Sequence, residues 1–214
     1  MNLKGAIKGK INHIIRNLSF IKVKNSIDKT TTRTVICNNC VGAMVLHDYG
    51  LAFNSPFVNL FIEPHDYLLL LNDLEYYCSP NADIQDISDN LGSDYPIGLL
   101  NGKIKLHFLH YDNFEKAVSI WRKRCLRIDF KKLYVIFVQQ SGCTDEMIQL
   151  FSKLPFPNKI VFVNKDKNSE FQFIISGFEN KKTLGLITAY TGWNGRRYYD
   201  DYDWKQFLHL IPTI

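Results

Sequence analysis

The sequence predicts a single α/β domain with a mixed, mostly parallel sheet and helices on both faces. Short, nearly continuous apolar runs such as residues 133–138 are typical of strands buried on both faces. Segments with helical periodicity separate these runs along most of the chain. Asn101 and Gly102 lie between two alternating segments, which predicts one β-hairpin with a type I′ turn.

Composition limits the classes of protein that the chain can belong to. Its 214 residues, 46% hydrophobic and 14% aromatic, suffice for one core. No apolar run reaches the roughly 20 residues of a membrane span, and no signal-peptide pattern opens the chain. Five scattered cysteines then favour a reducing cytoplasm without disulfides. The first 34 residues hold eight basic groups against Asp28, a net charge of +7; with +5 overall, the remainder carries −2. This distribution argues against a nucleic-acid partner.

Residues 1–30 are expected to form a basic amphipathic helix and linker outside an α/β domain of residues 31–214. Within residues 3–21, apolar side chains recur every three or four positions: Ile7, Ile11, Ile14, Leu18 and Ile21. Lysines flank this stripe, as in helices that lie on anionic membranes, which indicates a protein peripheral to the inner membrane. Packing of the helix on its own domain or on a partner protein explains the pattern equally well.

The remaining elements follow from periodicity and from signals at their ends. Strands are expected over residues 34–37, 57–62, 133–138, 159–163, 171–175 and 184–189. Helices are expected over residues 43–49, 63–77, 113–127, 144–154 and 202–210. Pro64 suits a first helical turn, and Asn113 and Thr144 suit helix N-caps. Residues 81–94 are acidic and are expected to form a surface loop.

The loop after the first strand is the main candidate site, because ligands of open α/β sheets bind at the carboxyl ends of strands. Cys40 opens the following helix, where the peptide dipoles favour a thiolate. Asn38 and Asn39 can donate to an oxyanion or cap the helix. Ser55, in the next turn, is a further candidate for binding a ligand. The alternative is an asparagine-capped turn with a buried cysteine.

His110 follows the hairpin and precedes Asp112, so it can act as a general base oriented by a carboxylate. It also fits a structural, hydrogen-bonded histidine. Cys40 and His110 are predicted to converge if their strands run parallel in one sheet. Arg124 and Arg127, three residues apart, suit bidentate binding of a diphosphate or carboxylate, or a solvated helix face.

Two further patterns carry less information. Cys37 and Cys40 form a CxxC pair, but no second Cys/His pair with ligand spacing follows, so we expect reduced thiols and no metal site. Residues 190–205 combine aromatic rings with arginines and aspartates. This composition suits stacking on sugar rings or an aromatic loop packed on the domain.

Eight segments carry a resemblance to a known family. They are residues 36–43 (ICNNCVGA), 54–57 (NSPF), 63–77, 95–99 (YPIGL), 107–112 (HFLHYD), 121–129 (WRKRCLRID), 142–147 (GCTDEM) and 154–163 (LPFPNKIVFV). As an ordered set they resemble a bacterial family of exopolysaccharide biosynthesis proteins, with an Asn-Asn-Cys loop. The family pattern has the second cysteine of this loop and commonly serine for the first, which weakens a redox role for Cys37. An aromatic residue often stands where this chain has Val41.

The resemblance implies a role in making or decorating surface polysaccharide, but it does not identify a reaction. The loop alone also resembles that of capsule-biosynthesis acetyltransferase-like proteins that bind coenzyme A. Two hypotheses follow. One is an acyl or related group transferase acting on a sugar or polysaccharide precursor, with coenzyme A or a nucleotide-sugar as cofactor. The other is a non-catalytic glycan or nucleotide-sugar binding protein that supports a membrane polysaccharide assembly.

Overall fold

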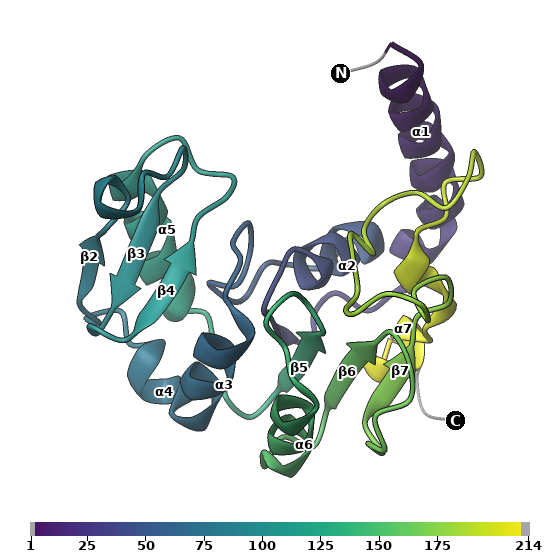
Figure 1. The fold of residues 1–214 in the computed structure, drawn as a ribbon. Helices are drawn as coiled ribbons and strands as arrows, with labels where there is room; N and C mark the ends of the chain where they lie inside the picture. The colour runs from purple at the N-terminus through teal and green to yellow at the C-terminus, as the bar shows by residue number, and fades with distance from the viewer. Residues whose placement is uncertain (1–2, 211–214) are drawn as a thin grey trace.

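The computed structural model describes residues 3–210 and confirms the α/β class. Its strands form a parallel sheet in the order β1-β5-β6-β7 and an antiparallel sheet in the order β2-β3-β4 (Figure 1). Their bounds are β1 Thr34–Cys37, β2 Ile84–Asp86, β3 Ile97–Leu100, β4 Ile104–His107, β5 Leu133–Val138, β6 Lys159–Val163 and β7 Gln172–Ile174. The hairpin therefore belongs to a small sheet of its own, beside the parallel one.

Helices cover both faces of the parallel sheet, as predicted. They are α1 Leu3–Ser26, α2 Val41–Tyr49, α3 Pro64–Asn72, α4 Leu74–Tyr77, α5 Phe114–Cys125, α6 Asp145–Lys153 and α7 Trp204–Phe207, with short 3-10 helices η1 Asp89–Leu91 and η2 Tyr198–Asp201. Along β5, Val135 and Phe137 join the core that includes α3 and α6. Ile136 and Val138 join the core on the other face, with α2 and α7. Alternate burial on two faces explains why this strand is apolar throughout.

The hairpin turn has the predicted geometry. Asn101 and Gly102 have φ angles of 47° and 67°, the positive values that both central residues of a type I′ turn require. The backbone N–H of Lys103 donates to the carbonyl of Leu100 at 3.1 Å and closes the turn. Strand β2 lies in the segment that was expected to be a loop and pairs with β3.

Several predicted elements differ in the structure. The expected strand at residues 57–62 is irregular and pairs only at Phe61, with His107. The expected strand at residues 184–189 is not one; Leu184 and Ile187 are buried by packing instead of sheet pairing. The expected helix over residues 63–77 is divided at Asp73 into α3 and α4.

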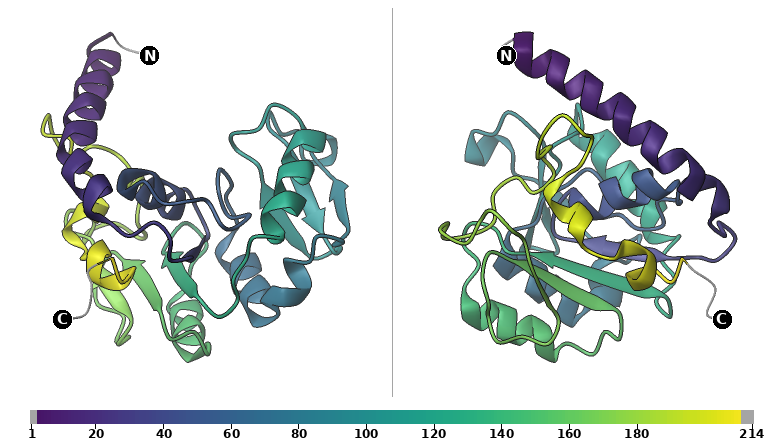
Figure 2. Two further views of the ribbon diagram at one scale, coloured as in Figure 1. Left: turned by 180° about the vertical axis from the view of Figure 1, so that it is seen from behind. Right: turned by 90° about the vertical axis from the view of Figure 1, so that its right-hand side faces the viewer.

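Helix α1 is longer than expected and contacts the domain through one side. Its carboxyl-terminal half lies against α2 and the loop before η2, and its amino-terminal end projects beyond the rest of the domain (Figures 1 and 2). The side chain of Asn12 donates to the carbonyl of Gly192 at 2.9 Å and accepts from the backbone N–H of Gly195 at 2.8 Å. None of the helices within residues 3–210 has the length and hydropathy needed to cross a bilayer.

Candidate functional site

Asn38 fixes the end of β1 to the neighbouring strand. Its side-chain amide donates to the carbonyl of Val138 at 3.0 Å and accepts from the N–H of Val138 at 2.9 Å. This side chain therefore continues the β1–β5 pairing by one step beyond Cys37. Because Asn38 is fully buried and both polar atoms are engaged with the strand, it supports the loop instead of contacting a ligand.

Asn39 and Gly42 shape the turn that carries Cys40. The Asn39 Oδ1 accepts from the backbone N–H of Val41 at 3.0 Å and from the Cys37 thiol at 3.3 Å, so it holds the first turn of α2 from the position before the N-cap. Gly42 allows α2 to approach β1 closely, because a Cβ there would lie 2.8 Å from the Cβ of Cys37. Cys40 is consequently held at the N-cap position of α2, directly after the strand end.

His110 reaches the loop through a connection between the two sheets. Phe61 and His107 exchange two backbone hydrogen bonds of 2.9 Å, and the N–H of Ile62 donates to the carbonyl of Asn38 at 2.9 Å. The short segment around Phe61 thereby joins the end of β4 to the end of β1. His107 is part of this connection through its backbone. Its side chain is buried, and burial lowers the pKa of the imidazole.

Cys40 and His110 converge as predicted, although 70 positions separate them. The Cys40 Sγ lies 3.5 Å from the His110 Nε2. The expected route was wrong, since β1 and β4 belong to different sheets. The expected thiolate is not supported either, because burial raises the pKa of Cys40. The resting group is a thiol, with the imidazole placed to take its proton.

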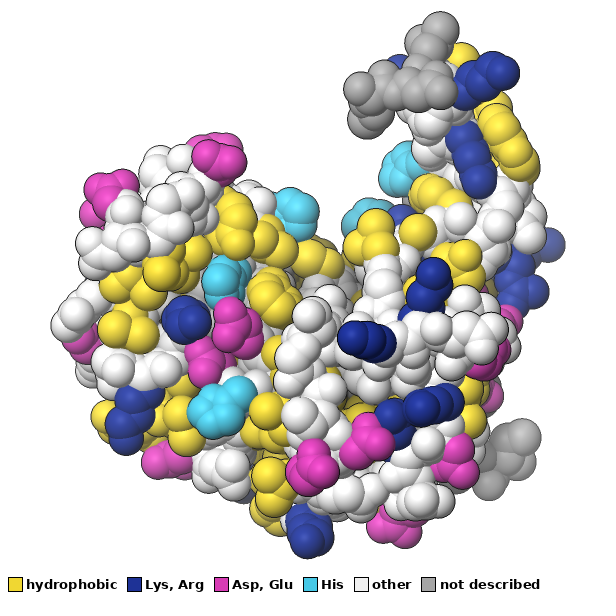
Figure 3. Space-filling model, in the orientation of Figure 1, with side chains coloured by type: hydrophobic (Ala, Val, Ile, Leu, Met, Phe, Trp, Pro, Cys, Tyr) yellow, Lys and Arg dark blue, Asp and Glu magenta, His cyan; other side chains and the backbone are white. Residues whose placement is uncertain are grey.

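Cys40 is shared by two hollows of different character. The larger, a cleft of about 530 Å³, is lined by His13, Arg16, Asn17, Cys40, Ala43, Met44, His47, Asp48, Phe53, Asn59, His110 and Arg197. Histidine side chains lie on both sides of the depression between the antiparallel sheet and α1 (Figure 3). The smaller hollow, about 230 Å³, is lined by Asn39, Cys40, Phe61, Leu109, Gln140, Gly185, Leu186, Ile187 and Thr188. The charged residues Arg16, Asp48 and Arg197 line the cleft, whereas none of the residues that line the smaller hollow is charged.

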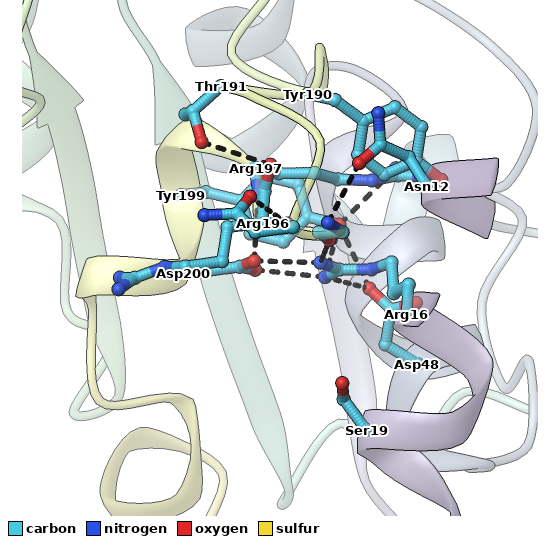
Figure 4. Close-up of polar contacts among 12 residues, drawn as sticks. Asn12, Arg16, Ser19, Asp48, Tyr190, Thr191, Arg196, Arg197, Tyr199 and Asp200 are labelled. Atoms are coloured by element: carbon cyan, nitrogen blue, oxygen red, sulfur yellow. Dashed lines mark hydrogen bonds and ion pairs between the residues drawn. The ribbon is translucent and has the colours of Figure 1, made fainter. Parts of the chain in front are cut away.

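The floor of the cleft is a buried ion-pair network centred on Arg16 (Figure 4). The guanidinium, 3% exposed, donates to Asp48 at 2.5 Å, to Asp200 at 2.7 and 2.9 Å, and to the carbonyl of Gly195 at 2.9 Å. Burial alone would lower the pKa of Arg16, but the hydrogen bonds to Asp200 and Asp48 outweigh it and raise that pKa. The network joins α1, α2 and η2, so the helix that was expected to be separable forms one wall of the site.

Arg197, in the aromatic segment of residues 190–205, lines the cleft, although its sequence pattern did not mark it as a site residue. Its guanidinium contacts neutral acceptors, the hydroxyls of Tyr190 and Tyr199 at 3.3 and 3.4 Å and the Met44 sulfur at 3.0 Å. Across residues 3–210 no carboxylate forms an ion pair with it. Its buried Nε also lacks a partner there. A cation without a counter-ion at a cleft wall suits an anionic ligand group.

The other predicted site residues lie outside both hollows. Ser55 is buried and donates to the carbonyl of Val35 at 2.6 Å. Asp112 pairs with Lys116 at 2.9 Å and forms no hydrogen bond with His110 in the described part of the chain. Arg124 donates to the Tyr111 hydroxyl at 3.1 Å, behind the cleft wall. Arg127 is exposed beyond the end of α5. These two arginines therefore do not form the expected phosphate grip.

Comparisons with known proteins relate nearly the whole described fold to one family. Residues 10–209 match a protein family described as "Domain of unknown function (DUF1919)". A protein of Haemophilus influenzae, described as uncharacterized, is 38% identical over 179 residues, which cover 82% of this chain and 84% of the relative. The family match includes most of α1, both sheets and both hollows.

Proposed function

This chain belongs to the family described as "Domain of unknown function (DUF1919)", and we propose that it is a group transferase, specifically an acyltransferase acting on a sugar of surface polysaccharide. The observation that carries the proposal is the 3.5 Å contact between the Cys40 Sγ and the His110 Nε2 at the junction of two hollows. A nucleophile and a base within hydrogen-bond reach are the minimum that covalent acyl transfer requires.

The proposed acyl transfer has two steps. In the first, the Cys40 Sγ attacks the carbonyl carbon of the acyl donor while its proton passes to the His110 Nε2. The donor's leaving group departs with that proton, and a thioester remains on Cys40. In the second, His110 takes the proton of a sugar hydroxyl, whose oxygen attacks the thioester. The sugar ester forms, and the proton returns to Sγ to regenerate the thiol. The raised pKa of Cys40 makes the base necessary at each turnover.

The two hollows suit the two parts of such a substrate pair. The apolar hollow, with Phe61, Leu109 and Ile187, accommodates the acyl group beside the thiol. The cleft accommodates the anionic and sugar portions, with Arg197 for a phosphate or carboxylate and the ring of Phe53 for a sugar face. Coenzyme A and nucleotide-sugars both carry phosphates that this arginine can bind. The role in exopolysaccharide synthesis is supported by the ordered motifs around residues 36–43 and 107–112.

The test is acylation of the intact protein by acetyl-coenzyme A, followed by intact-mass and peptide-mass measurement. We expect one acetyl group on Cys40, a labelling rate that falls about 100-fold or more in His110→Gln, and no label in Cys40→Ala. Cys143→Ala is the matched control, because Cys143 is also half-buried and lies outside both hollows. Label that persists in Cys40→Ala, or a rate that is unchanged in His110→Gln, would refute the mechanism. Nucleotide-sugar binding without any acyl-enzyme would favour the non-catalytic binding protein.

A further inference from the structure

Helix α1 presents one apolar stripe to solvent and packs its other side, which carries Asn12, Arg16, Phe20 and Val23, against its own domain. The stripe consists of Ile7, Ile11, Ile14, Leu18 and Ile21, with exposures of 46%, 39%, 58%, 64% and 52%. Asn12 and Arg16, about half a helical turn away from it, are buried against the domain. A surface helix normally keeps its apolar residues on the side that faces the core, so this stripe is apolar surface that the domain does not cover. A contiguous exposed apolar surface of this kind indicates an interaction site.

The charges around the stripe are of one sign. Helix α1 contains no acidic residue, and Lys10 and Lys22 lie beside the stripe. Arg16 is neutralised by Asp48 and Asp200, so the outward positive charge belongs to the lysines. Next to the helix, Trp193 is 56% exposed, with the Lys8 amine 6.0 Å from the centre of its ring.

We propose that α1 lies in the plane of an anionic lipid surface, with the stripe at the boundary of the acyl chains. The lysine side chains can extend from the stripe to phosphate headgroups. A second copy of the chain is a poorer occupant, because stripe-to-stripe packing would bring lysines of one helix beside lysines of the other. Anionic headgroups attract the lysines without that repulsion.

This docking does not depend on the proposed acyl transfer, but it bears on the position of the site. His13 and Asn17, on one flank of α1, line the cleft that contains Cys40. Arg16 fixes the helix on the domain, so the helix and the cleft wall approach a lipid surface together. The cleft is thereby placed beside the headgroup layer, within reach of an amphiphilic ligand.

Sedimentation of the full-length protein with lipid vesicles tests the proposal. We expect binding to vesicles of phosphatidylcholine with phosphatidylglycerol, weak binding to phosphatidylcholine alone, and a decrease with added salt. The variant Ile14→Gln/Leu18→Gln should reduce the partition coefficient by a factor on the order of ten or more. Its matched control is Leu126→Gln/Leu150→Gln, which removes two leucines that are 74% and 56% exposed on other elements. The control should bind as the wild type does.

A second pair of variants tests the charge. Lys10→Gln/Lys22→Gln should weaken binding to the anionic vesicles by about tenfold or more. Lys181→Gln/Lys182→Gln, with the same change in net charge at exposed positions far from α1 in sequence, should not. Equal thermal midpoints will show that all variants are folded. Failure of the wild type to bind anionic vesicles, or unchanged binding of Ile14→Gln/Leu18→Gln, would overturn the proposal. A dimer that this variant abolishes, without vesicle binding, would identify a second copy as the occupant.

Discussion

Substituting Arg16 by methionine measures how firmly α1 belongs to the domain. The change removes the guanidinium that pairs with the Asp48 carboxylate, and the Asp48 side chain is only 6% exposed. Asp200 loses two hydrogen bonds from the same guanidinium. Removing one partner of a buried ion pair costs about 3–5 kcal/mol. We therefore expect the free energy of unfolding to fall by about 3 kcal/mol or more.

The assay is urea unfolding followed by tryptophan fluorescence. Arg196→Met is the matched control, because the same substitution there breaks an ion pair with Asp201 in which both side chains are more than half exposed. This control should lose less than about 1 kcal/mol. The double variant Arg16→Met/Asp48→Leu should recover part of the loss, since it removes the more deeply buried of the two carboxylates that Arg16 pairs with. A loss within about 1 kcal/mol for Arg16→Met would refute the reasoning and would favour the boundary near residue 30 that the sequence predicts.

Two further predictions concern the loop and its buried thiol. Asn38→Ala leaves the N–H and the carbonyl of Val138 without partners. Thermal and urea unfolding should therefore show that the free energy of unfolding falls by about 2–4 kcal/mol. A decrease below about 0.5 kcal/mol would contradict the structural role of Asn38. Burial raises the pKa of Cys37 from 9.0 to about 12. Because the folded state favours the neutral thiol, the contribution of this group to stability is complete below pH 9 and is lost as the pH rises from 9 through 12. Urea titrations across that range should give a flatter decline for Cys37→Ala than for the wild type, and identical slopes would show that the thiol is not the cause.

Local patterns predicted the parts of the fold that depend on neighbouring residues. The Asn101-Gly102 turn, the N-caps at Asn113 and Thr144 and the doubly buried strand at residues 133–138 are all present. The division into two sheets was not predictable in this way. Strand β2 is short and largely exposed, and only its pairing with β3 makes it a strand. Pairing partners are set by tertiary packing, which strand propensity does not describe.

The site was predictable in its central pair and not in its surroundings. A cysteine at a strand end and a histidine after a hairpin marked Cys40 and His110 as candidates. The alternation of residues along a strand does not show where a loop side chain points, so Ser55 could not be recognised as a buried donor. Arg197 was hidden for a different reason. Its neighbours in the cleft come from α1 and α2, more than 140 residues earlier in the chain.

The backbone connection at Phe61 makes the reactive pair a product of the complete fold. Cys40 belongs to the end of one sheet and His110 to the end of the other, and the paired backbone of Phe61 and His107 sets the distance between them. Neither sheet alone contains both groups. The 70-residue separation adds a loop-closure cost to this contact, so we expect it to form after local structure during folding. A partly folded chain thus carries the Cys40 thiol without His110 beside it, so the proposed acyl transfer would require the complete fold.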